Sequence, residues 1–399
     1  MKIVIYQFGG RDASKVYNST HSPSLINDIS DRLVGELDTS TIPEDWNKEE
    51  KSPKSATSAN QVYQKPPLQD IINLDDFEQV AMNTLSPKSW AYSSGAANDN
   101  FTRDANRKFF RDIWFRPAIM RNVSQVVTRS NLFGCDLDIP VYVSPVGAAK
   151  MVCEEGELPL ARGTGASGIA QCISTPASYP LSEILDVTPK QAFYQLYINK
   201  DRPKTEALVR QATDSGKVKA IFVTADLPVM SKREADERLK AEDNAAMVNV
   251  TQDTKSAGKK SAGFAKSNSS FIDSTLNWND LKWLRSITRL PILVKGIQRV
   301  EDARIAMQVG FDGIIVSNHG GRAADTAPPA ILILLEIHRY CPEIFGKMKV
   351  LVDGGFSRGS DVVKAVCLGA SAVGLGRSFH YSINYGQQGV EHAVNSEYS

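Results

Sequence analysis

The 399-residue chain lacks any Cys-x-x-Cys pair, and its five cysteines are scattered and odd in number. This arrangement gives no framework of disulfides. Most of the cysteines lie in apolar segments, which predicts reduced thiols in the core of an intracellular protein. They are Cys135, Cys153, Cys172, Cys341 and Cys367.

Strong net charge and long apolar runs are also missing. The 46 basic and 45 acidic side chains leave a net charge of +1, so nothing favours a nucleic-acid or membrane-surface partner. The longest apolar runs, such as Ile331–Leu335, are too short to span a bilayer. No signal peptide or Arg/Ser-rich presequence is evident, so we expect a cytoplasmic location, with the mitochondrion as the alternative.

Composition divides the chain into three zones. Residues 1–40 form a short segment with apolar positions of its own. Residues 41–69 are rich in Ser, Thr, Lys, Glu and Pro, which is typical of a solvated linker. Residues 70–399 have a globular composition and are long enough to bury a large core.

Eight short apolar or β-branched runs alternate with helical patterns in the globular zone. This alternation over roughly 250 residues predicts an α/β fold of the (β/α)8 TIM-barrel class. A doubly wound open sheet is the alternative, but eight units favour closure. The expected strands are residues 140–144, 168–173, 192–197, 219–224, 291–295, 313–317, 349–352 and 372–375. A long insertion after the fourth strand, residues 232–271, is expected to be a lid or disordered.

The loop after the sixth strand carries two side chains that could take part in chemistry. His319 can take up a proton near neutral pH, and Arg322 is a planar, permanently charged receptor for a carboxylate. The glycines between them let a ligand approach the backbone. Taken alone, His319 is more simply read as a turn histidine, but polar side chains at the ends of the other strands favour an enzyme that deprotonates a small carboxylic acid.

Polar residues follow seven of the eight expected strands, and a barrel brings these strand ends together. Glycine-rich turns after strands seven and eight, the latter with Arg377, predict a phosphate site. Lys295 in an apolar strand favours an anionic partner. A phosphate, a Lys beside a redox ring and a His base together suggest flavin mononucleotide (FMN). The strand-end residues are Ser174, Gln195, Tyr197, Thr224, Asp226, Lys295, His319, Arg322, Asp353, Gly355, Gly376 and Arg377.

Several motifs resemble those of the FMN-dependent α-hydroxy-acid dehydrogenase/oxidase family, especially its cytochrome-linked L-lactate dehydrogenase (flavocytochrome) branch. The resemblance covers Asp70 to about Ala393, and a (β/α)8 barrel is its implied fold. The motifs are Tyr194-Gln195-Leu196-Tyr197, Phe222-Val223-Thr224-Ala225-Asp226, Lys232-Arg233-Glu234, Leu293-Val294-Lys295-Gly296, Ser317–Arg322 and Val352-Asp353-Gly354-Gly355.

The resemblance implies a role for each of these residues. His319 is the expected base and Asp226 its partner, while Arg322 and Tyr92 bind the substrate carboxylate. Tyr197 binds the substrate hydroxyl, and Arg233 is a second cation. The implied flavin contacts are Ser174, Gln195, Thr224, Lys295, Ser317, Asp353, Gly355, Gly376 and Arg377. No metal site is expected.

The sequence departs from this family pattern at several positions. One of two adjacent Arg that commonly hold the phosphate is Ser357, so FMN affinity is expected to be lower. Val146-Gly147 replaces a Thr-Ala pair at the flavin edge, and Ala323-Ala324 is expected to loosen packing beside the base. The chain also ends at Ser399, short of much of the usual last helix.

Residues 8–37 resemble the second half of a cytochrome b5-type haem domain. His21 matches one of the two axial ligands that such a domain needs, but no His-Pro-Gly-Gly segment supplies the other. We therefore expect a truncated remnant without haem, although an unrelated helix pair fits so short a match as well.

The leading hypothesis is FMN-dependent oxidation of an L-2-hydroxy acid, with lactate as the first candidate. Electrons would pass from the flavin to an external acceptor: O2, a quinone or a separate cytochrome. The alternatives are a diverged paralogue with weak flavin binding and little turnover, and another FMN barrel such as an isomerase. A homo-oligomer is expected from the resemblance.

Overall fold

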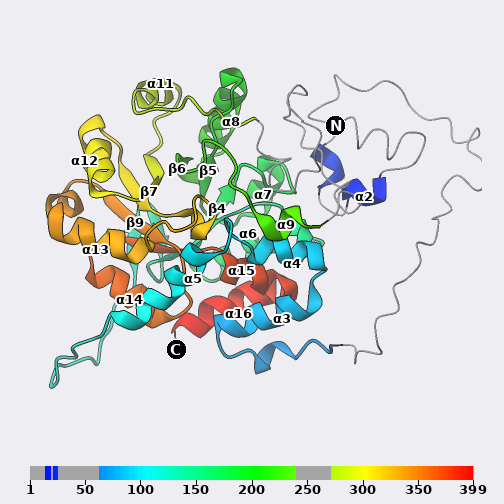
Figure 1. Cartoon of the computed structure of the whole chain (residues 1–399), viewed down its shortest axis with the longest axis horizontal. Coiled ribbons are helices and arrows are strands. Elements are labelled where there is room, and N and C mark those ends of the chain that lie inside the picture. Colours follow the sequence, from blue (N-terminus) through cyan, green and yellow to red (C-terminus); the bar gives the residue numbers. More distant parts are fainter. Residues whose placement is uncertain (1–13, 19–20, 26–62, 240–270, 399) are drawn as a thin grey trace, which may run out of the picture.

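A closed barrel of eight parallel strands forms the centre of the protein (Figure 1). The computed structural model describes residues 14–18, 21–25, 63–239 and 271–398. The strand order around the barrel is β10-β3-β4-β5-β6-β7-β8-β9, and every neighbouring pair is parallel. This confirms the predicted (β/α)8 architecture and excludes the open doubly wound sheet.

The eight strands coincide with the eight predicted runs. Nearly all of their residues are buried, because helices cover the outer face of the sheet and side chains fill its interior. The strands are β3 (Val141–Val146), β4 (Ala170–Ser174), β5 (Ala192–Leu196), β6 (Val218–Thr224), β7 (Ile292–Ile297), β8 (Gly313–Val316), β9 (Lys349–Asp353) and β10 (Ala372–Leu375).

Large aromatic rings fill the barrel interior. Tyr142 meets Phe193 and Phe222 edge-on, and the latter two rings stack with their centroids 5.0 Å apart. A short antiparallel hairpin, β1 (Ser130–Leu132) and β2 (Cys135–Leu137), joins the same cluster through Leu132 and Leu137. The sequence did not predict this hairpin, because strands of three residues carry no readable alternation.

Helices follow the strands and form the outer layer. The helical patterns expected between the strands lie at residues 157–167, 204–215, 299–308, 329–339 and 360–368 of the sequence, and each coincides with a helix within one or two residues at each end. The helices after strands are α6 (Leu158–Ala166), α7 (Leu181–Val187), α8 (Arg202–Asp214), α9 (Glu234–Glu237), α11 (Asp280–Ile287), α12 (Val300–Val309), α13 (Ala330–Tyr340), α14 (Gly359–Cys367), α15 (Arg377–Ser382) and α16 (Gly386–Tyr398).

Three helices that precede the barrel in sequence pack beside its last helices. They are α3 (Leu74–Thr84), α4 (Pro87–Ser94) and α5 (Phe101–Lys108). A capping box at Asn73 starts α3, and Ser86 with Pro87 starts α4. Figure 1 shows α3 and α4 beside α15 and α16, while α5 lies next to the loop that follows β8. This placement brings residues near position 100 to the catalytic loop near position 320.

The buried carboxylate of Glu157 joins the segments that follow β3 and β4. Its Oε1 accepts hydrogen bonds from the backbone N–H of Ala149 at 3.0 Å and of Ser178 at 2.9 Å. Burial raises the pKa of Glu157 to about 7. The contact fixes the backbone next to Gly147, one wall of the site described below.

Much of the predicted N-terminal segment, most of the linker and the interior of the insertion lie outside the described residues. The described end of the linker contacts the globular part, since Tyr385 donates a hydrogen bond to the carbonyl of Pro66 at 2.8 Å. His21 lies near the barrel, where its carbonyl accepts a hydrogen bond from Lys150 at 3.3 Å. In the described part of the chain, no helix is long and apolar enough to cross a membrane.

Candidate active site

Polar side chains meet at the carboxyl end of the barrel, where parallel strands end together. Ser174 pairs with Gln195 in the β4–β5 register, and Thr224 pairs with Lys295 between β6 and β7. The amide of Gln195 accepts a hydrogen bond from Ser174 Oγ at 3.1 Å and donates one to Thr224 Oγ1 at 2.9 Å. Three neighbouring strands thus present one hydrogen-bonded row.

Lys295 continues this row as a buried cation. Its Nζ lies 3.3 Å from a carboxylate oxygen of Asp353 and donates a hydrogen bond to Ser317 Oγ at 2.8 Å. Burial lowers the pKa of Lys295, but the carboxylates of Asp353 and Asp226 outweigh it, so the net shift is upward. Lys295 is therefore charged at neutral pH and offers its charge at the floor of the site.

His319 and Asp226 form the central pair. His319 Nδ1 lies 2.9 Å from Asp226 Oδ1, and the Asp226 side chain has no exposed surface. A Cβ atom at Gly296 would lie only 2.5 Å from the Asp226 Cβ, so glycine is needed there to make room for the carboxylate. Asp226 enters from the end of β6, and His319 starts the 3-10 turn η7 (His319–Gly321) after β8.

The two pKa values have moved in the directions a base and its partner require. Burial lowers the pKa of His319 below 6.5 despite the opposing effect of Asp226, so the imidazole is neutral at pH 7. Burial alone would raise the pKa of Asp226, but His319 and Lys295 outweigh it and lower it. The arrangement is a neutral imidazole held by an ionised carboxylate, which is suited to accept a proton at Nε2.

A cavity of about 100 Å³ lies in front of His319. Five of the six predicted catalytic residues line it. The sixth, Asp226, does not line the cavity but contacts His319. Gly147 and Pro176 form part of the wall, and the Tyr92 hydroxyl lies 3.5 Å from the Gly147 carbonyl. The five lining residues are Tyr92, Tyr197, Arg233, His319 and Arg322.

Positive charge dominates this cavity. Arg322 donates hydrogen bonds from Nη2 to the carbonyls of Tyr92 and Ser93, whereas its Nε is buried with no hydrogen-bond partner among the described residues. Burial, together with Arg377 and Arg233, lowers the pKa of Arg322 to about 9, so it stays protonated at neutral pH. An unpaired donor beside several cations is a binding site for an anion such as a carboxylate.

A larger cavity of about 340 Å³ shares His319 and Arg322 with the first. Its walls come from the ends of β3, β7, β9 and β10 and from helices α3 to α5. The predicted cofactor residues Lys295, Asp353, Gly355, Gly376 and Arg377 line it, and Ser174 and Gln195 line the smaller one. Thr224 and Ser317 line neither cavity, and they contact Gln195 and Lys295 instead.

A family model described as FMN-dependent dehydrogenase matches residues 81–396. The chain belongs to the FMN-dependent dehydrogenase family. It is 37% identical to the L-lactate dehydrogenase (cytochrome) of Wickerhamomyces anomalus over 402 residues, covering 98% of this chain and 68% of that protein. It is 38% identical to glycolate oxidase 3 of Oryza sativa subsp. indica over 325 residues, covering 80% of this chain and 88% of that protein.

Solved structures agree with this family membership. The recombinant flavin-binding domain of baker's yeast flavocytochrome b2 superposes with a TM-score of 0.74 at 40% identity, covering 84% of this chain and 81% of that one. A mandelate oxidase gives a TM-score of 0.72 at 34% identity, covering 82% and 92%. The predicted resemblance to the flavocytochrome branch is confirmed.

The larger cavity fits the flavin that this FMN-dependent dehydrogenase family uses. Arg377, at one end, has a buried Nε with no hydrogen-bond partner among the described residues. Beside it the turn at Gly354 and Gly355 has φ angles of 114° and 85°, a left-handed conformation that suits glycine and brings backbone close to a ligand. Lys295 supplies a cation further in. The cavity thus offers an anion site at one end and a charged polar floor for a ring.

Sequence reasoning missed a buried amide pair that supports the catalytic loop. Asn106 and Asn318 exchange two side-chain hydrogen bonds, of 2.8 and 2.9 Å. Asn318 Oδ1 also accepts from the Gly321 N–H at 3.1 Å, which shapes the turn holding His319. Asn318 was visible inside the motif, but its partner is 212 positions away, so no local pattern revealed the pair.

We expect this amide pair to contribute jointly to stability. Asn106→Ala or Asn318→Ala alone leaves a buried amide without its partner, which costs about 1–3 kcal/mol. The double variant is expected to lose less than the sum of the two, because neither orphan remains. Thermal unfolding of the two single variants and the double variant measures this coupling. Strictly additive losses would show that the two amides act independently.

Proposed function

We propose that this chain oxidises an L-2-hydroxy acid to the 2-keto acid with FMN as its cofactor, and that L-lactate is the first substrate to test. The observation that carries the proposal is the neutral His319, hydrogen-bonded to Asp226, in the same cavity as the Arg322 guanidinium. A base and a carboxylate receptor side by side are what deprotonation of a hydroxy acid requires.

Each side chain then has a defined task. Arg322 binds the substrate carboxylate, with Arg233 and Tyr92 beside it. Tyr197, whose pKa is raised by burial, keeps its proton and can donate a hydrogen bond to the substrate hydroxyl. His319 takes the hydroxyl proton at Nε2, because Nδ1 already faces Asp226, and Asp226 stabilises the imidazolium that results.

FMN, when bound, supplies the two-electron acceptor that no side chain can provide. Ser174, Gln195 and Thr224 form the hydrogen-bonded row against which its ring would lie, and Lys295 places a positive charge near it, supported by Ser317. Asp353, Gly355, Gly376 and Arg377 would hold the ribityl chain and phosphate. These roles are carried over from the family motifs. Seven of the nine residues line one of the two cavities, and Thr224 and Ser317 contact Gln195 and Lys295.

Names of relatives guide the choice of substrate and acceptor. An L-lactate dehydrogenase (cytochrome) and a glycolate oxidase both cover most of this chain, so small 2-hydroxy acids are the substrate class to test.

We expect no haem, since His21 matches only one of two ligands, and electrons then pass to O2, a quinone or a separate cytochrome. Within the described residues, no cluster of His, Cys, Asp and Glu could hold a metal ion. All five cysteines are free thiols, which suits the cytoplasm.

A second candidate is a diverged paralogue that binds flavin weakly. Ser357 favours it, because a neutral hydroxyl replaces a cation at the expected phosphate end. Against it, His319 and Asp226 are hydrogen-bonded and Arg322 lines the same cavity as His319.

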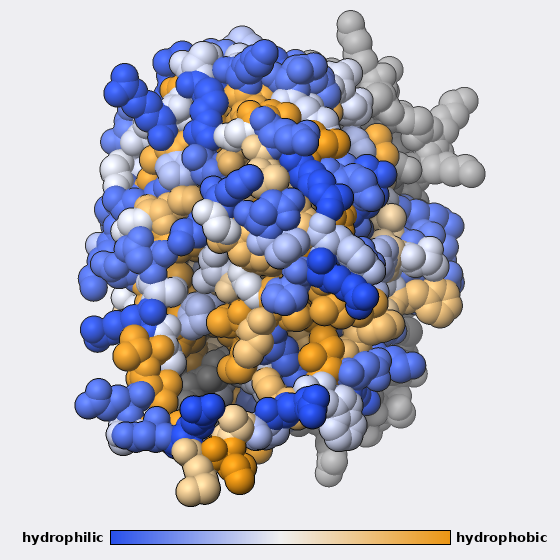
Figure 2. All heavy atoms as spheres, turned by 90° about the vertical axis from the view of Figure 1, so that its left-hand side faces the viewer, coloured by the Kyte–Doolittle hydropathy of each residue, from blue (hydrophilic) through white to orange (hydrophobic). Residues whose placement is uncertain are grey.

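We further propose a homo-oligomer, on the basis of an exposed apolar segment at residues 113–127 that extends away from the barrel near α14 (Figure 1). Figure 2 shows the face bearing α12 to α14, with apolar side chains exposed in its lower part. Such a concentration is uncommon on a monomer. The exposed apolar residues of the segment are Trp114, Phe115, Ile119, Met120, Val123, Val126 and Val127.

Anaerobic addition of L-lactate is expected to bleach the visible flavin absorption of the purified protein. His319→Gln is expected to keep the flavin bands but to slow bleaching by about 10²–10⁴-fold, because the base is lost. The matched control is His338→Gln, which changes an exposed histidine of α13. Persistent bands with lactate, glycolate and larger hydroxy acids would contradict the proposed reaction. Absence of flavin after FMN addition would favour the diverged paralogue.

For the oligomer, the double variant Ile119→Lys, Val127→Lys is expected to convert the assembly to monomers, because it places charge in a contact that buries apolar surface. Light scattering after gel filtration measures the mass. The control Val229→Lys adds one such charge at another exposed valine, in the segment after β6, and should leave the mass unchanged. A monomeric parent protein would contradict the proposal.

A further inference from the structure

Three arginines from three different elements converge on the last carbonyls of helix α4. Arg322 donates to the carbonyls of Tyr92 and Ser93, and Arg103 Nη1 donates to that of Ser94 at 3.2 Å. Arg377 Nη2 donates to the carbonyl of Gly95 at 3.4 Å and also to that of Gly320 at 2.8 Å. The carboxyl end of a helix carries partial negative charge and carbonyls without intrahelical partners, so it can hold several guanidinium groups together.

These consecutive carbonyls place the guanidinium groups in a row. Arg322 and Arg377 line both cavities, and Arg103 lines the larger one. Arg322 and Arg377 form no salt bridge within the described part of the chain. Arg103 pairs through Nε with Asp104 at 2.7 Å, but the Asp104 side chain is 66% exposed and water screens its charge. The row therefore carries excess positive charge into the cavity.

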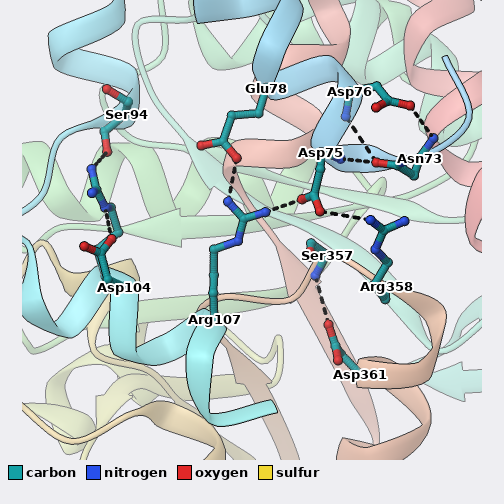
Figure 3. Close-up of polar contacts among 11 residues, drawn as sticks. Asn73, Asp75, Asp76, Glu78, Ser94, Asp104, Arg107, Ser357, Arg358 and Asp361 are labelled. Atoms are coloured by element: carbon teal, nitrogen blue, oxygen red, sulfur yellow. Dashed lines mark hydrogen bonds and ion pairs between the residues drawn. The ribbon is translucent and has the colours of Figure 1, made fainter. Parts of the chain in front are cut away.

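The other arginines that the structure describes near this end of the cavity, Arg107 and Arg358, are paired with carboxylates. Ser357 is neutral, and its N–H points to Asp361 at 3.4 Å. Figure 3 shows Arg107 held by Asp75 and Glu78, and Arg358 paired with Asp75 at 3.1 Å. These two arginines pair with Asp75 and Glu78 of α3. Among the described residues, Arg103 is then the arginine of this cavity end whose one carboxylate partner, Asp104, is largely exposed to water.

The backbone fixes the position of Arg103 closely. A Cβ atom at Gly321 would lie 2.6 Å from the Arg103 nitrogen, so the start of α5 packs directly on the catalytic turn. Asp325 reinforces this contact by accepting a hydrogen bond from the N–H of Thr102 at 2.9 Å. The backbone of Arg103 is thus held between the loop that carries His319 and the end of the larger cavity at Arg377.

We propose that Arg103, together with Arg377, binds the terminal phosphate of FMN, and that Arg103 supplies the cation that Ser357 does not. The phosphate accepts hydrogen bonds from both guanidinium groups, which relieves the repulsion between them. Helix α4 acts as the positioning element, since its carbonyls hold both groups. This inference rests on the proposed use of FMN.

The test compares FMN with riboflavin, which has the same ring but no phosphate. Dissociation constants are measured by quenching of flavin fluorescence with the full-length protein after removal of its flavin. Arg103→Gln is expected to weaken FMN binding by about 10- to 100-fold, the loss of one or two charge-assisted hydrogen bonds. Riboflavin binding is expected to be unchanged. Arg111→Gln, an exposed arginine in the same segment, is the control and should affect neither ligand.

A rescue variant separates a phosphate contact from a structural role. The double variant Arg103→Gln, Ser357→Arg is expected to bind FMN more tightly than Arg103→Gln alone. The loss of FMN affinity caused by Arg103→Gln is therefore expected to be smaller when position 357 is Arg than when it is Ser. Equal weakening of FMN and riboflavin by Arg103→Gln, or no weakening of either, overturns the inference while leaving the proposed function intact. Failure of the parent protein to bind either flavin overturns the proposed function itself, and the inference with it.

Discussion

His319 Nδ1 lies 2.9 Å from a carboxylate oxygen of Asp226, and that carboxylate has no exposed surface. The hydrogen bond fixes the ring orientation and leaves Nε2 as the nitrogen that faces the cavity. It also joins the ends of β6 and β8, two strands separated by β7 in the barrel. Gly296, at the end of β7, makes this possible by leaving space for Asp226.

The charges around this pair balance only when an anion is bound. Lys295 is matched by Asp353, and Asp226 is matched by Lys295 and by His319 once protonated. Arg322 and Arg377 have neighbouring cations but no carboxylate partner among the described residues. In the proposed function this positive charge would serve two anions, a substrate carboxylate and a phosphate, and the carbonyls of Tyr92, Ser93 and Gly95 hold the two guanidinium groups in place.

Helices α4 and α5 are as important to the site as the barrel. They precede the first barrel strand by more than 30 positions, yet they supply Tyr92, Asn106 and the carbonyls that position Arg322. Asp325 binds the start of α5 through two backbone N–H groups, those of Asp99 and Thr102. The two Ala residues before Asp325 were expected to loosen this region, but the carboxylate contacts fix it to α5.

The sequence predicted the barrel well because buried parallel strands are short, apolar and regularly spaced. It also brought His319, Asp226 and Arg322 to one end of the barrel, since strand ends in such a barrel meet by geometry and the motifs matched a family. Contacts between distant segments could not be predicted. The Asn106–Asn318 pair, the β1–β2 hairpin and the row of arginines on α4 depend on which turns come together, and no local pattern records that.

The roles of Ser357 and Gly147 show the limits of motif reading. Ser357 was identified as a missing cation, but its surroundings contain Arg103, which the motif did not include. Val146-Gly147 was identified as a replacement of a Thr-Ala pair. A Cβ atom at Gly147 would lie 2.7 Å from the Pro176 carbonyl, so the two loops pack too closely here for a side chain at that position.

The most direct test of the account is the pH dependence of flavin reduction by L-lactate, measured anaerobically in single turnover. The account predicts a rate that falls as pH drops through a pKa below 6.5, where His319 becomes protonated, and that is constant above it. The variant Asp226→Asn is expected to lower the pKa of His319 further and to slow the rate on the high-pH plateau, because the imidazolium loses its carboxylate partner. A rate that is independent of pH between 5 and 8 in both proteins, at unchanged speed, would contradict the assignment of His319 as the base.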